Sequence, residues 1–142
     1  DNITIPSMRD MGTFLSDKKL HDFADLYAKQ MQTKMVNVKQ YVSALSGGNK
    51  QKVVFAKWIG NKSDILILDC PTRGIDIGVK VAMYQLMYRL KKEGKSIIMI
   101  SEELPELIGM SDRIMVLKDG QLTHTFTRSA DLKETDVIHY MI

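Results

Sequence analysis

The sequence predicts an α/β fold in which helices flank a largely parallel sheet. Two short, nearly continuous apolar runs, 64–69 and 96–101, are typical of buried parallel strands. Between them, about 77–93, apolar residues recur at helical spacing. Strands that alternate with helices favour a layered α/β architecture. Hydrophobic residues make up 44% of the 142 residues and charged residues 26%, which is an ordinary globular composition.

The first part of the chain is expected to be mainly helical. Residues 1–15 look irregular, and Ser16 can cap a helix that runs to about Met35. The apolar residues on one face of this helix are Leu20, Phe23, Tyr27, Met31 and Met35. A polar linker leads to a second helix over about 48–59, which Gly60–Asn61 should end.

The last part should contain a short helix, a hairpin and a final helix. Residues 104–110 form the short helix, with Pro105 tolerated in its first turn. The runs 113–118 and 121–127, joined by Asp119–Gly120, carry a hairpin signature. A final helix is expected over about 131–142.

The bulk properties exclude several classes of protein. Twenty basic and 17 acidic residues give a net charge of +3, too weak and dispersed to imply nucleic acid. One cysteine cannot form an internal disulfide. No apolar run approaches the roughly 18 residues that span a bilayer. The start has no signal-peptide core and no initiator Met, so we expect a piece of a longer chain.

The first candidate site is the turn Ser46–Gly47–Gly48 ahead of a helix. Exposed N–H groups and the positive end of the helix dipole bind anions, and glycines let a phosphate approach the backbone. Lys50 and Lys52 would add positive charge. The competing interpretation is an ordinary glycine turn with a serine cap, and the turn taken alone favours that interpretation.

The second candidate site lies at the C-terminal ends of the two strands, where ligands bind in parallel sheets. Asp69 ends the first strand, and Ser101–Glu102 follow the second. A carboxylate next to a phosphate-holding loop can hold Mg²⁺ directly or through water. The alternative is that Asp69 only caps the next turn.

Taken together, the ordered motifs resemble the ABC-transporter ATPase family. LSGGNKQKV resembles its signature motif, ILILD its Walker B strand, and Gly74–Asp76 its D-loop. Ser101–Glu102 falls on the switch region, and MSDRIMVLKDGQL resembles the stretch after it. Within this family, the chain most resembles the second nucleotide-binding half of ribose-, galactose- and xylose-type monosaccharide importers. This narrower resemblance rests on the segments LSGGNKQKVVFAKW, TRGIDIG and SEELPELIGMSDRI.

The resemblance implies roles for specific residues, with ATP and Mg²⁺ as cofactors. Two such halves pair head to tail, and each ATP lies between one half and the signature motif of the other. The residues expected to contact ATP held by the partner half are Ser46, Gly47, Gly48 and Gln51. The residues expected at this half's own site are Asp69 (which would hold Mg²⁺ indirectly), Cys70, Asp76 and Glu102. Asp76 either shapes the water path or caps the following helix.

The phosphate-binding pattern G-x-x-x-x-G-K-[ST] does not occur in the sequence. Gly94-Lys95-Ser96 matches only the last three positions of this pattern, because Arg89 stands where the earlier glycine is required. We therefore expect an incomplete P-loop NTPase domain that lacks the P-loop strand, with a gap or exposed edge in its sheet. Residues 1–45 would belong to a helical subdomain and linker, and residues 46–142 to the C-terminal part of the ATPase core. Alone, this chain is not expected to hydrolyse ATP.

Two departures from the family pattern weaken this half's own site. Cys70 replaces the usual glutamate, and a neutral thiol is a poor proton acceptor. Glu102 replaces the usual histidine and would repel the γ-phosphate. Cys70 could instead fill a small buried space; a nucleophilic role lacks a base, because His21, His124 and His139 fall on elements away from the strand end. The prediction is an asymmetric ATPase whose own site is degenerate.

The leading functional hypothesis is an ATP-binding subunit of a carbohydrate importer, cytoplasmic and peripheral to the inner face of the membrane. Its partners would be the other nucleotide-binding half, the transmembrane permease subunits and, indirectly, a periplasmic or extracellular sugar-binding protein, with no nucleic acid. The alternatives are a soluble ABC-type module in DNA repair or translation and a non-hydrolysing regulatory domain. Salt-sensitive binding of nucleic acid would favour the first alternative.

Overall fold

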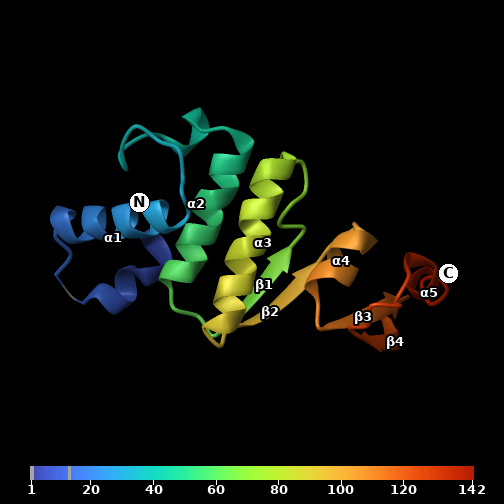
Figure 1. Ribbon diagram of the computed structural model, residues 1–142. Helices are drawn as coiled ribbons and strands as arrows, with labels where there is room; N and C mark the ends of the chain where they lie inside the picture. The colour runs from blue at the N-terminus through green and yellow to red at the C-terminus, as the bar shows by residue number, and fades with distance from the viewer. Residues whose placement is uncertain (1, 13) are drawn as a thin grey trace. The chain divides into compact units, whose positions relative to one another are not determined.

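The computed structural model describes residues 2–12 and 14–142 and shows two units that are each compact. The first extends to Ile98 and the second begins at Met99. The first unit holds η1 (Ile5–Met11), α1 (Asp17–Gln30), η2 (Val42–Ala44), α2 (Gly47–Gly60), β1 (Ile65–Asp69) and α3 (Ile77–Lys92). Strand β2 (Ser96–Ile100) crosses from one unit to the next, and the second unit continues with α4 (Leu104–Met110), β3 (Arg113–Lys118), β4 (Gln121–Thr127) and α5 (Glu134–Ile138) (Figure 1).

Helix α1 begins as the sequence predicts and ends earlier than it predicts. The Ser16 side chain accepts a hydrogen bond from the Lys19 N–H at 3.3 Å and so caps the helix. The helix stops at Gln30 rather than near Met35, because Gln32 adopts the left-handed conformation with φ of 51°. The 3-10 helix η1 was not predicted from the sequence, in which residues 1–15 look irregular.

Helices α1 and η1 both pack against α2, which contains most of the signature-like segment LSGGNKQKV. The N-terminal segment and α2 therefore belong to one unit. The boundary after residue 45 therefore does not coincide with a division between the compact units. The assignment of 1–45 to a helical subdomain stays a prediction.

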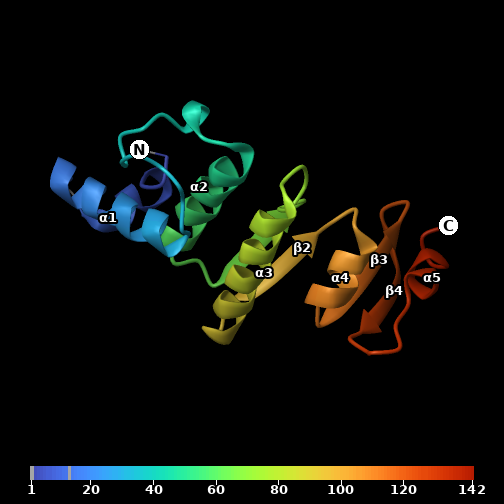
Figure 2. The same ribbon diagram turned by 45° about the horizontal axis from the view of Figure 1, so that its top comes forward.

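Strands β1 and β2 are neighbours in a two-stranded sheet, and their arrows point the same way in Figure 1; in Figure 2 the labelled strand of this pair is β2. Helix α3 connects them, as predicted from the helical spacing over about 77–93, and buries Met83, Leu86, Met87 and Leu90. Gly94, with φ of 87°, follows the helix and ends it. The α/β fold with a parallel strand pair is confirmed.

The prediction that both strands are buried is wrong. On β1 only Leu66 is buried, whereas Ile65 is 61% and Ile67 69% exposed. On β2 the alternation is the same, and no residue is fully buried. The side chains of a strand point alternately to its two faces, so in this structure one face of the sheet is covered and the other is open.

The second unit is organised around the predicted hairpin. Strands β3 and β4 pair antiparallel, with a bulge between Val116 and Leu117, and the turn uses Asp119 and Gly120 at positive φ. Its core consists of Ile114, Val116 and Val137. Helix α5 covers only Glu134–Ile138, much less than the predicted 131–142.

The strands form two separate sheets, because in the described part of the chain β2 pairs only with β1 and β3 only with β4. The sequence-based expectation of a gap in the sheet is consistent with this pairing.

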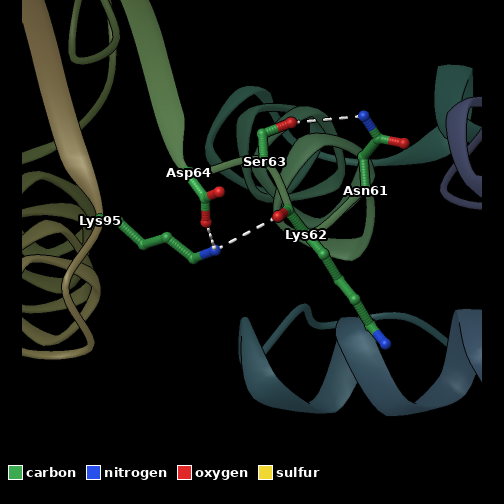
Figure 3. A network of polar contacts seen from close by, with 5 residues as sticks. All are labelled: Asn61, Lys62, Ser63, Asp64 and Lys95. Carbon is green, nitrogen blue, oxygen red and sulfur yellow. Dashed lines mark hydrogen bonds and ion pairs between the residues drawn. The ribbon is translucent and has the colours of Figure 1, made fainter.

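A polar network fixes the turn at which β1 begins (Figure 3). The Lys95 ammonium lies 3.1 Å from Asp64 Oδ1 and donates a hydrogen bond to the Lys62 carbonyl at 3.3 Å. Beside it, the Asn61 amide donates a hydrogen bond to Ser63 Oγ at 3.3 Å. The backbone N–H of Ser96 also donates to the Asp64 carbonyl at 2.9 Å. The network joins the starts of β1 and β2.

Candidate functional site

The Ser46–Gly47 turn presents the start of α2 to solvent. Ser46 is the N-cap residue, but its hydroxyl makes no cap bond to the helix backbone and instead accepts from Asn49 Nδ2 at 2.9 Å. Gly47 is exposed, and a Cβ added there would meet nothing within 4 Å. The first N–H groups of a helix have no intrahelical acceptor, and the dipole is positive there. This turn can therefore receive an anionic group.

Gly48 has a second role that the sequence does not reveal. It is buried, and a Cβ built on it would lie 2.7 Å from Val79 Cγ2 on α3. A side chain at this position would therefore collide with α3. The glycine lets the first turn of α2 pack closely against the first turn of α3.

The predicted contribution of Lys52 to the anion site is wrong. Lys52 is buried, and its ammonium donates to the Gln32 carbonyl at 3.1 Å, just beyond the end of α1. The charge is thus used to fix the chain after α1. Lys50 is exposed and remains available near the turn.

Asp69 ends β1, as predicted, and it is exposed. A single exposed carboxylate at a strand end suits Mg²⁺, which usually takes one or two carboxylates and keeps several waters or phosphate oxygens. In residues 2–12 and 14–142 there is no cluster of three or more histidine, cysteine, aspartate or glutamate side chains that could hold a metal by themselves.

The chain turns sharply after Asp69. Cys70 is half-buried and has a φ of 44°, in the left-handed region that non-glycine residues rarely adopt. The Arg73 N–H donates to the Cys70 carbonyl at 3.2 Å and closes the turn. From outside the turn, the Gln51 side chain donates from Nε2 to the Pro71 carbonyl at 2.8 Å. Gln51 is one helical turn beyond the buried Gly48, so the two residues lie on the same face of α2. That spacing is the feature of the sequence that could have indicated a partly buried Gln51.

Asp76 caps α3, which was one of its two predicted roles. Its Oδ1 accepts a hydrogen bond from the Val79 N–H at 3.0 Å. A role in the water path stays a prediction.

In the second unit, the residues after β2 are braced by a buried carboxylate. Ser101 Oγ donates a hydrogen bond to Glu106 Oε2 and accepts one from the Glu103 N–H at 3.1 Å. Glu106 is only 6% exposed. Glu102, which lies between Ser101 and Glu103 in the sequence, is exposed. The sequence-based reasoning missed Glu106, although its place in the first turn of a short helix puts it within reach of a residue just ahead of that helix.

Comparison with known proteins gives consistent matches. The family model described as ABC transporter matches residues 6–73. The ribose import ATP-binding protein RbsA of Halalkalibacterium halodurans is 42% identical over 142 residues, or 99% of this chain and 28% of that protein. The galactose/methyl galactoside import ATP-binding protein MglA of Treponema pallidum is 44% identical over 93% of this chain and 26% of that protein. The chain thus spans about a quarter of the length of the curated relatives it matches.

Solved structures share the fold at lower identity. The dimeric bacterial ABC transporter cassette MJ0796 matches with a TM-score of 0.78 and 21% identity over 90% of this chain and 55% of that chain. The ATP-binding cassette MJ1267 matches with a TM-score of 0.78 and 15% identity over 98% of this chain and 60% of that chain. None of the helices in the described residues is long and apolar enough to cross a membrane.

Proposed function

Because the chain belongs to the ABC transporter family, we propose that it acts in the ATP-binding subunit of a monosaccharide importer. The import proteins named above, for ribose and for galactose or methyl galactoside, support a sugar as the cargo. The observation that carries the proposal is the exposed Ser46–Gly47 turn at the positive end of α2. This turn suits the phosphates of a nucleotide, and binding them there requires no catalytic group of this chain.

The signature turn serves ATP held by the partner half. Ser46 offers a hydroxyl, and Gly47 and Gly48 carry the first two N–H groups of α2. Together these three donors would bind phosphate oxygens. In this arrangement the chain donates hydrogen bonds and a positive dipole, and it moves no proton.

This half's own site uses the strand end. Asp69 would hold Mg²⁺ through water, and the ion would neutralise charge on the phosphates. Cys70 stands where a water-activating carboxylate is required, and a neutral thiol accepts a proton poorly. The family resemblance puts Glu102 at a position that usually holds histidine, and a carboxylate there would not donate a hydrogen bond to a phosphate. The site is therefore suited to binding nucleotide and poorly suited to hydrolysing it.

The proposed assembly places this chain as the second of two nucleotide-binding halves beneath the transmembrane permease subunits. It would lie in the cytoplasm at the inner face of the membrane, and the sugar would arrive from an external binding protein. This chain would then transmit nucleotide binding to the permease without touching the sugar.

Uptake of labelled sugars tests the proposal. Cells that lack the gene should lose import of one or more pentoses or hexoses, while uptake of an amino acid stays normal. The wild-type gene should restore import, and a Ser46→Arg variant should not, because the arginine fills the phosphate position. Unchanged uptake of every monosaccharide in the deleted strain would contradict the proposal.

A further inference from the structure

The first turns of α2 contact the start of the loop that follows β1 and the first turn of α3, which comes after that loop. At the start of the loop, Gln51 Nε2 donates to the Pro71 carbonyl at 2.8 Å. On α3, Gly48 packs so closely on Val79 that a Cβ would lie 2.7 Å from its methyl group. The segment 71–79 is therefore held at two points by the same helix that presents Ser46 and Gly47.

We propose that Gln51 is a positioning residue that fixes the loop after Asp69 and couples it to the signature turn. This inference rests on the function proposed above. In this proposal Gln51 acts through the backbone of Pro71, in place of the contact with the partner's ATP that the sequence predicts. A shift of α2 that follows engagement of the partner's ATP would thus be passed to Cys70 and to the end of β1.

The hydrogen bond matters because it satisfies the carbonyl of a buried residue. Pro71 is buried and has no N–H, so its carbonyl is its only polar backbone group. A buried carbonyl that loses its partner carries the cost of desolvation without compensation. The preceding residue, Cys70, already has a φ of 44°, so the loop depends on contacts from outside to keep this conformation.

The position of Gln51 on α2 supports the same role. Gln51 is three residues after Gly48, and residues at this spacing lie on one face of a helix. Gly48 faces Val79, so the Gln51 side chain extends over the packing surface between α2 and the loop. Gln51 is half-buried, unlike Ser46 and Gly47, which are exposed.

The test uses the full-length protein assembled with its permease. Gln51→Met removes the donor and keeps the length of the side chain, and Gln51→Lys keeps an N–H donor. Gln85→Met is the matched control, since Gln85 is an exposed glutamine on α3. Two quantities are measured: steady-state ATPase kinetics, and hydrogen exchange of the amides at 72–76.

For Gln51→Met we expect exchange at 72–76 to quicken about threefold to tenfold. We expect kcat to fall by a similar factor, because coupling is reciprocal and a freed loop also loosens the signature turn that would serve the partner's ATP, with KM for ATP changed less than twofold. Gln51→Lys should recover part of both losses, and Gln85→Met should change neither. A raised KM with normal kcat would overturn the inference, because Gln51 would then contact nucleotide. Unchanged exchange in both Gln51 variants would also overturn it. If the wild-type protein has no ATPase activity, the proposed function fails, and the exchange result still decides the role of Gln51.

Discussion

Replacing Gly48 by alanine tests the close packing of α2 on α3. The added Cβ would lie 2.7 Å from Val79 Cγ2 and 3.2 Å from Val79 Cγ1, distances that require the backbone or the valine to move. Gly47→Ala is the matched control one residue earlier, because nothing lies within 4 Å of the added Cβ there.

The two substitutions should have opposite effects on stability. Overpacking in a close contact costs about 1–3 kcal/mol. Replacing glycine by alanine in a helix returns roughly 0.5–1 kcal/mol. Gly48→Ala should therefore lower the free energy of unfolding by about 1–2 kcal/mol, whereas Gly47→Ala should raise it by up to about 1 kcal/mol.

Equilibrium urea unfolding measures both effects, and a Val79→Ala background isolates their cause. Val79→Ala removes the two methyl groups nearest to the new Cβ and keeps the Cβ of residue 79, at 3.4 Å. In that background Gly48→Ala should become neutral or stabilising, like Gly47→Ala. If Gly48→Ala is harmless in the wild type, or equally harmful with and without Val79, the packing role of Gly48 is refuted.

Two further substitutions test individual contacts by urea unfolding. Lys52→Met should destabilise the protein by about 1–3 kcal/mol, because it leaves the Gln32 carbonyl without its buried donor; the exposed control Lys50→Met should change stability by less than about 0.5 kcal/mol. Asp76→Ala should cost about 1 kcal/mol by removing the cap on the Val79 N–H, and Asp76→Asn, which keeps an acceptor, should cost much less. Equal losses for Lys52 and Lys50, or for the two Asp76 variants, would contradict these assignments.

The parts of the fold that depend on local patterns could be predicted from the sequence. Ser16 and Asp76 are helix caps, and Asp119–Gly120 makes the hairpin turn. The end of α1 was missed because it depends on Gln32, whose carbonyl is bound by the distant Lys52. Nothing in the local sequence marks that point with glycine or proline.

The candidate site shows the same division. Ser46 at a helix start and Asp69 at a strand end are positions that spacing alone suggests. The contacts of Gly48 with Val79 and of Gln51 with Pro71 join residues far apart in the sequence, so they appear only when the chain is folded. Burial of the strands was overestimated because a continuous apolar run does not reveal whether one face or both are covered.

The most direct test of the proposed division of roles is ATP turnover by the intact protein with its permease. We expect Ser46→Arg to abolish most turnover, because in the proposed arrangement the signature turn would serve the hydrolysing site of the partner half. Cys70→Ala should leave turnover nearly unchanged, since this half's own site contributes little. A Ser46→Arg protein with normal turnover, together with a Cys70→Ala protein that has lost it, would contradict the asymmetric assignment.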